Sequence, residues 1–246
     1  MESIFCLIEP IMRIFTRKFL IAFFDRLYRL LTDVRMENLD FIPKDGPLIM
    51  ALNHMSRIDF PLFCTNGRRD DWAAFIADSY RSWPILRQVV KDSEMIWIDR
   101  SKADFTAFKK ALDWLKAGNL FILAPEGTRS RTGQLIEGKQ GIVMLAQKSG
   151  VPVCTGSITG TEDFLNDFKH FRKPKIEIYF TPLVVMDPID MADREASMQR
   201  GTDELMCRIA SMLPESYRGH YKSYPRVQEL IAEWKNTPGL KLPESV

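Results

Sequence analysis

A histidine and an aspartate, residue types suited to proton transfer, lie close together within the first third of the chain. His54 and Asp59 directly follow an apolar run, residues 48–52. A regular helix would separate side chains five positions apart by about 140°, so these two meet only if the chain turns between them. A strand-to-helix loop provides that turn, and the carboxylate would then hold the imidazole in one tautomer for use as a general base. The alternative interpretation is structural: His54 would be a surface histidine, and Asp59 and Ser56 would cap the next helix.

A second segment, residues 125–133, has the composition of an anion-binding loop. It follows another apolar run, 120–124, and contains hydroxyls, two arginines and two glycines. Gly127 lets backbone amides approach an oxyanion, and Arg129 can hold phosphate through its fork of donors. Glu126 can orient that group or accept a hydrogen bond from a sugar-like hydroxyl. The glycine-lysine pattern of a Walker loop is absent, and a solvated turn is the alternative interpretation.

Alternating strands and helices are predicted to position these segments. Short apolar runs between turn residues predict strands at 47–52, 72–77, 94–98, 120–124, 151–158 and 175–180. Apolar residues at helical spacing predict helices at 103–117, 139–149, 192–212 and 227–234. This alternation predicts an α/β fold, with a mostly parallel or mixed sheet flanked by helices. Active sites of such sheets lie at the carboxyl ends of the strands.

The amino-terminal residues are apolar but repeatedly interrupted by charges. The uncharged runs 3–8 and 19–24 are only six residues long, whereas a membrane-spanning helix needs about 20 apolar residues. Pro10 is expected to separate a short helix from a longer one. The longer helix would carry an apolar stripe beside basic residues, which is typical of a helix at a membrane surface. A helix packed on the core of the main domain would have the same stripe. The stripe comprises Met12, Thr16, Phe19, Phe23, Leu27 and Leu30.

Composition excludes several classes of protein. The 246 residues are 46% hydrophobic and 27% charged, which indicates a globular protein with a sizeable core. Lys and Arg total 34 against 32 Asp and Glu, so bulk charge does not favour nucleic acid as a partner. The four cysteines are far apart, which favours a reducing compartment. The three histidines have no metal-ligand spacing, so we expect no metal.

Four sequence blocks, in this order, resemble the glycerolipid acyltransferase family, typified by bacterial 1-acylglycerol-3-phosphate acyltransferase. The resemblance covers roughly residues 35–185, with Ala124 where phenylalanine is usual. Lys139 and Gly141 also resemble residues that follow the third block. The blocks are Asn53, His54, Ser56 and Asp59; then Ile98, Asp99 and Arg100; then residues 125–130; and finally residues 151–153.

The resemblance implies acyl transfer from a thioester. His54 would take the proton from an acceptor hydroxyl, and Asp59 would hold His54 in position. The donor would be acyl-CoA or an acyl carrier protein, used as a co-substrate, and no resident cofactor is implied. Residues 156–160 do not have the G-x-S-x-G spacing of a nucleophile elbow, in agreement with direct attack. By analogy, the strand near Val153 is a candidate for the oxyanion donor. The expected substrate-binding residues are Asn53, Ser56, Arg100, Glu126, Gly127, Thr128, Arg129 and Lys139.

The expected reaction acylates 1-acylglycerol 3-phosphate to phosphatidic acid in phospholipid biosynthesis. Glycerol 3-phosphate or a lysolipid without phosphate is the nearest alternative acceptor. A thioester hydrolase, in which His54 activates water, and a non-catalytic lipid-binding protein are alternatives of other classes.

The resemblance also implies a two-helix membrane anchor, as in the bacterial members of the family. We therefore expect an anchor at residues 1–34, an acyltransferase domain at 35–215 and a carboxy-terminal helix and tail at 216–246. The protein would lie on the cytoplasmic face of a membrane, in bacteria the inner membrane, without crossing it. A basic cluster can attract anionic lipid or the phosphates of CoA, or can be a solvated loop. It comprises Lys169, His170, Arg172, Lys173 and Lys175.

Overall fold

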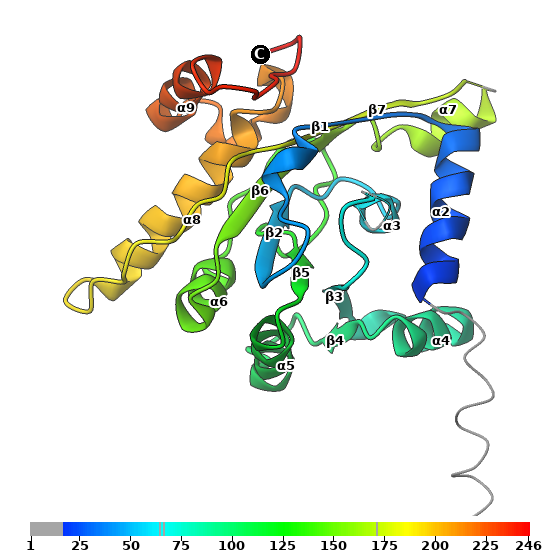
Figure 1. Cartoon of the computed structure of the whole chain (residues 1–246), viewed down its shortest axis with the longest axis horizontal. Coiled ribbons are helices and arrows are strands. Elements are labelled where there is room, and N and C mark those ends of the chain that lie inside the picture. Colours follow the sequence, from blue (N-terminus) through cyan, green and yellow to red (C-terminus); the bar gives the residue numbers. More distant parts are fainter. Residues whose placement is uncertain (1–16, 64, 66, 171) are drawn as a thin grey trace, which may run out of the picture.

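The protein is built on one seven-stranded sheet, seen in a computed structural model that describes residues 17–63, 65, 67–170 and 172–246 (Figure 1). The strand order is β1-β7-β6-β2-β5-β3-β4. All neighbouring pairs are parallel except β6 and β7, which are antiparallel. The predicted α/β fold with a mostly parallel or mixed sheet is therefore confirmed. The strands are β1 (Asp33–Glu37), β2 (Leu48–Leu52), β3 (Trp72–Ala77), β4 (Ile96–Ile98), β5 (Leu120–Leu123), β6 (Val153–Thr159) and β7 (Lys175–Phe180).

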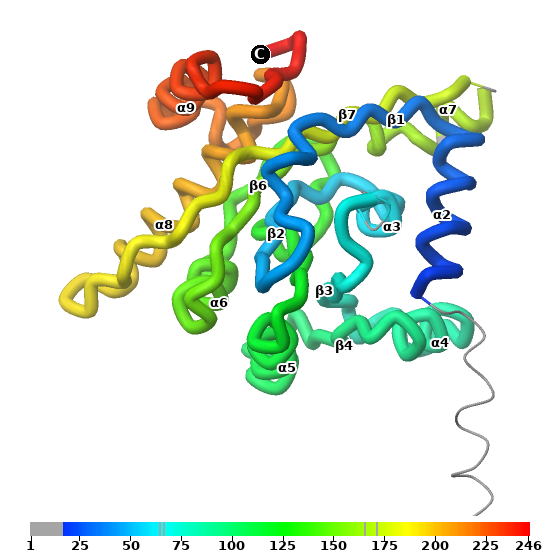
Figure 2. Tube along the Cα trace, viewed as in Figure 1, coloured from blue at the N-terminus to red at the C-terminus, as the bar shows by residue number. Residues whose placement is uncertain are grey.

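Helices cover both faces of this sheet (Figure 2). The described α-helices are α2 (Arg17–Leu31), α3 (Asp59–Phe63), α4 (Pro84–Asp92), α5 (Phe105–Lys116), α6 (Gly141–Ser149), α7 (Phe164–Lys169), α8 (Arg194–Ala210) and α9 (Pro225–Lys235). Short 3-10 turns lie at Leu39–Phe41, Asp78–Tyr80, Glu215–Tyr217 and Gly219–Tyr221.

The central strand β2 explains the two layers of helices. All five of its residues are buried, and successive side chains of a strand point to opposite faces. Leu48, Met50 and Leu52 pack in the same cluster as residues of α2 and α3. Ile49 and Ala51 pack with residues of α5, α6 and α8 on the other face. A continuous apolar run is therefore what a strand buried on both faces requires.

Three elements, β1, α4 and α7, were not predicted from the sequence patterns. β1 is a polar edge strand, DVRME, paired with β7. Edge strands often carry charges, so apolar periodicity does not reveal them. α4 begins with Pro84 at its first turn, a position that suits proline. The expected boundary between residues 34 and 35 falls inside β1.

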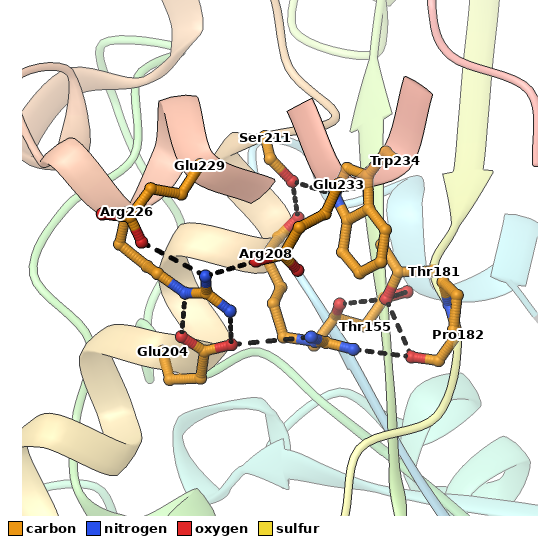
Figure 3. Close-up of polar contacts among 10 residues, drawn as sticks. All are labelled: Thr155, Thr181, Pro182, Glu204, Arg208, Ser211, Arg226, Glu229, Glu233 and Trp234. Carbon is orange, nitrogen blue, oxygen red and sulfur yellow. Dashed lines mark hydrogen bonds and ion pairs between the residues drawn. The ribbon is translucent and has the colours of Figure 1, made fainter. Parts of the chain in front are cut away.

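Helix α9 packs against α8 through a polar network (Figure 3). Arg226 pairs with Glu204 at 2.8 Å and with Glu233 at 2.7 Å. The Arg208 guanidinium lies 5.0 Å from the centre of the Trp234 ring. The residues from 216 onward include the helix α9 and contribute buried side chains to a core shared with α8.

Helix α2 buries some of its apolar side chains against the core and exposes others. Leu20 and Tyr28 are buried, and the Tyr28 hydroxyl donates to the Ile58 carbonyl at 2.8 Å. Phe23 and Leu30 are 50% and 66% exposed. The predicted longer helix is confirmed over 17–31, whereas the shorter helix and the break at Pro10 lie outside the described residues. Within the described part of the chain, no helix has the length and apolar character needed to cross a membrane.

Candidate active site

The predicted turn between His54 and Asp59 is present. β2 ends at Leu52 and α3 begins at Asp59. The intervening loop brings His54 Nδ1 to 2.9 Å from Asp59 Oδ2. The His54 side chain is 27% exposed, and that of Asp59 only 1%. With Nδ1 donating to the carboxylate, Nε2 is the nitrogen left to act on a substrate.

The Asp59 carboxylate also shapes the loop that carries His54. Its Oδ2 accepts hydrogen bonds from the backbone N–H of Met55 at 2.7 Å and of Ser56 at 2.8 Å. Asp59 therefore closes the loop before α3 through these two bonds. Its expected structural role was to cap the following helix. The backbone of Ser56 takes part in this closure, and its expected contact with substrate stays a prediction.

The backbone of His54 is held by the second motif. The Ser130 N–H donates to the His54 carbonyl at 2.8 Å. The His54 N–H donates to Glu126 Oε1 at 2.9 Å, and the Ile136 N–H donates to Glu126 Oε2 at 3.1 Å. β2 and β5 are parallel neighbours, so the loops at their carboxyl ends meet.

Glu126 occupies a different place from the expected one among the acceptor ligands. Its side chain is fully buried and lines neither of the two cavities described below. Burial penalises the charged carboxylate and raises the pKa of Glu126 to about 7, although hydrogen bonds from His54 and Ile136 oppose this shift. Its carboxylate therefore contacts the backbone of the loop that carries His54 and lines neither cavity.

An apolar cavity of about 1150 Å³ opens beside His54. It exceeds the roughly 300–1,000 Å³ typical of small-molecule sites, so it has room for a long ligand. α2 contributes Leu20 and Phe24 to its wall. Trp83 and Phe105 line it while being 54% and 77% exposed, so they stand at its mouth.

A polar cavity of about 330 Å³ adjoins the apolar one. The two share Tyr80, Arg100, Thr128 and Arg129 in their walls. Arg100 Nη1 donates to the Gly127 carbonyl at 3.2 Å, which brings the second block against the third. Guanidinium groups and hydroxyls in one cavity suit a phosphate group.

The remaining predicted residues have distinct surroundings. Asn53 is buried, and its side-chain amide bonds both the N–H of Ile158 at 2.8 Å and its carbonyl at 2.9 Å. Gly127 has a φ of +67°, which favours glycine. A Cβ added there would lie 2.9 Å from the Lys139 side chain, which lines the apolar cavity. Asn53 thus links the loop that carries His54 to β6, and the absence of a side chain at Gly127 leaves room for Lys139.

Val153, named as the candidate for the oxyanion donor, lies at the amino end of β6, away from His54. The Val153 N–H donates to the Val184 carbonyl at 2.8 Å. Val153 pairs with Ile49 near the amino end of β2, whereas His54 follows the carboxyl end. The Val153 N–H is therefore already bonded and lies toward the amino end of β2, away from His54, whereas an oxyanion role for other residues of this strand stays a prediction.

Several lining residues were missed by the sequence analysis. Arg131 and Glu162 line the polar cavity with Tyr80. Arg131 lies in the same motif as Arg129, so its position could have identified it as a binding residue. The sequence around Tyr80 and Glu162 contains no motif that points to a binding site. The basic cluster at 169–175 is exposed and lines neither cavity. Across the described residues, no group of three or more metal-ligating side chains could hold a metal ion.

The chain is similar to known acyltransferases over its α/β core. The acyltransferase family model matches residues 33–159. A 1-acyl-sn-glycerol-3-phosphate acyltransferase of Limnanthes douglasii is 40% identical over 116 residues, which cover 45% of this chain and 39% of that protein. A probable enzyme of the same name from Mycoplasma pneumoniae is 26% identical over 168 residues, covering 63% and 62%.

A solved structure has a similar fold. The crystal structure of the 1-acyl-sn-glycerophosphate (LPA) acyltransferase PlsC from Thermotoga maritima matches with a TM-score of 0.59 and 28% identity, covering 77% of this chain and 80% of that one. The matched region spans only about two fifths of the length of the Limnanthes relatives.

Proposed function

The chain belongs to the acyltransferase family, and we propose that it transfers a fatty acyl group from a thioester to the free hydroxyl of 1-acylglycerol 3-phosphate, giving phosphatidic acid. The observation that carries this proposal is the position of the His54–Asp59 pair beside an apolar cavity and an adjoining arginine-lined one. One cavity suits an acyl chain and the other a phosphate. Names of the similar proteins agree with this substrate.

The proposed reaction is a direct attack on the thioester. His54 Nε2 takes the proton from the acceptor hydroxyl while the oxygen attacks the thioester carbonyl. The tetrahedral intermediate then expels the thiolate, which takes the proton from the His54 imidazolium. Asp59 holds Nδ1–H, so Nε2 is left to take the proton in every cycle. These steps use only side chains of this chain and the two substrates; acyl-CoA or an acyl carrier protein would supply the thioester.

The polar cavity favours a phosphate-bearing acceptor over a lysolipid without phosphate. Arg100, Arg129 and Arg131 all line it. The size of the apolar cavity favours a lysolipid over glycerol 3-phosphate, because the acceptor brings an acyl chain of its own.

The function is tested by acceptor-dependent release of free thiol. Purified protein in detergent is given a panel of acyl-CoAs and acylated carrier protein, with and without 1-acylglycerol 3-phosphate. We expect thiol release only with the acceptor, together with formation of phosphatidic acid. Equal release without the acceptor would identify a hydrolase, and release with glycerol 3-phosphate alone would identify the alternative acceptor.

We also propose that the protein works on a membrane surface, at the cytoplasmic face. α2 carries exposed Phe19, Phe23 and Leu30, and the cavity that α2 lines has exposed Trp83 at its mouth. Apolar side chains of this kind insert at the boundary between headgroups and acyl chains. A lipid acceptor could then enter the cavity without leaving the membrane. The bacterial inner membrane stays a prediction.

Replacing Phe23 and Leu30 by serine is expected to weaken binding to lipid vesicles. Full burial of such a side chain contributes about 1.5–3 kcal/mol, and each is at least half exposed in the protein. We expect the partition coefficient to fall roughly tenfold or more. Sedimentation with vesicles of neutral and anionic lipid measures it.

The matched control replaces Val185 and Met191, which are 71% and 77% exposed in the segment before α8, distant from α2 in Figure 1. Serine at these positions should leave vesicle binding unchanged. An equal loss in both double variants would contradict the assignment of the membrane face to α2.

A further inference from the structure

We propose that Glu126 is a positioning residue that holds His54 through its backbone and does not bind the acceptor. This inference deepens the proposed function and rests on it. The Glu126 side chain is fully buried, whereas Thr128 and Arg129, two and three residues later in the same motif, line both cavities. One side of this loop therefore lines the two cavities, and the other side holds the backbone of His54.

Both polar groups of the His54 backbone are held by this loop. Glu126 Oε1 accepts from the His54 N–H at 2.9 Å, and the His54 carbonyl accepts from the Ser130 N–H at 2.8 Å. These bonds fix the peptide units on either side of the His54 Cα. The side chain then needs only one further contact, Nδ1 to Asp59 at 2.9 Å, to be oriented.

A carboxylate is the group that this position requires. Two backbone N–H groups, from His54 and Ile136, converge on the two oxygens of Glu126. The ionised form of Glu126, which predominates above its pKa of about 7, accepts at both oxygens, whereas an amide would turn its NH₂ group toward one of the N–H donors. The second hydrogen bond, from the Ile136 N–H, ties Glu126 to the segment that follows the motif.

Burying an acidic side chain is unfavourable, and the complete burial of Glu126 therefore supports a dedicated role for it in holding His54. Burial is the largest influence on the pKa of Glu126, and the nearby Asp59 carboxylate raises it further. The two backbone hydrogen bonds act in the opposite direction. A glutamine would avoid this cost but would give up one of the two bonds.

The first test separates kcat from KM in Glu126→Gln. A displaced His54 should lower kcat about 10- to 100-fold, because small misplacements of a catalytic group have effects of this size. The KM for 1-acylglycerol 3-phosphate should stay within about twofold of the wild-type value. A raised acceptor KM with an unchanged kcat would show that Glu126 binds the acceptor and would overturn the proposal.

Two further variants accompany this test. Glu137→Gln removes the same charge from an exposed residue of the same segment, and its kcat and KM should not change. Glu126→Asp keeps the charge but is one methylene too short to reach both N–H groups, so kcat should fall while the acceptor KM is kept. If Glu126→Gln does not fold, Glu126→Asp supplies the same comparison.

A second readout needs no turnover and so separates this inference from the proposed function. The proton on His54 Nδ1, bonded to Asp59, is expected to give a low-field NMR signal that is absent in His54→Ala. In Glu126→Gln this signal should shift or broaden, while signals of His170 and His220 stay in place. An unchanged His54 signal would refute positioning by Glu126 even if the protein had no acyltransferase activity.

Discussion

Replacing His54 by alanine is expected to lower acceptor-dependent thiol release by about 10²–10⁴-fold, the range that a positioned general base contributes. Among the residues that the structure describes, His54 is the only histidine that lines either cavity, and its Nδ1 lies 2.9 Å from Asp59 Oδ2. Without it, nothing in that position removes the proton from the acceptor hydroxyl. Initial rates over a range of acceptor concentrations measure the effect.

Vesicle binding supplies the control for His54→Ala. His54 belongs to the cavity wall and not to the exposed face of α2, so sedimentation with vesicles should be unchanged. Asp59→Asn should also reduce kcat, because an amide can hold the imidazole in the wrong tautomer. Full activity of His54→Ala would exclude His54 as the general base and so reject the proposed mechanism.

Replacing Arg129 by alanine is expected to reduce kcat/KM for 1-acylglycerol 3-phosphate by about 10- to 150-fold. This range corresponds to roughly 1.5–3 kcal/mol for hydrogen bonds to a charged group. Arg129 lines both cavities, and no ion-pair partner for it is found among the described residues. Its guanidinium is thus available to a phosphate. Arg129→Lys should recover only part of the loss, because lysine lacks the fork of donors.

The acceptor without phosphate provides the decisive comparison for Arg129. 1-Acylglycerol should be a poor substrate of the wild-type protein, and Arg129→Ala should not weaken its use further. Arg194→Ala, at an exposed arginine at the start of α8, is the control for loss of positive charge. A similar loss with both acceptors would mean that Arg129 supports the fold of the loop and does not recognise phosphate.

The fold was predictable where a local pattern had one structural solution. Apolar runs of four to six residues identified β2, β3 and β5 because strands inside a covered sheet are apolar on both faces. The edge strand β1 was missed because its polar residues resemble a loop. The helix predicted over 139–149 ends at Ser149 as expected, and Gly150 follows it with a φ of +66°, a conformation that favours glycine.

The sequence by itself determined the chemistry of the candidate site. His54 and Asp59 are five residues apart, so one local turn was enough to pair them. The arginines of the motif directly follow β5, so their place at the carboxyl edge of the sheet followed from the alternation of strands and helices. Family membership, too, was carried by these short blocks and is confirmed by the match over residues 33–159.

Only the tertiary structure decided which side of each loop faces the substrate. Glu126 and Arg129 are neighbours in sequence, but the first contacts the backbone of His54 and the second lines the cavities. The apolar cavity likewise combines α2 with Phe105, residues far apart along the chain. Such contacts depend on strand order and on the packing of helices across the sheet, which bring distant segments together without leaving a signal in either segment alone.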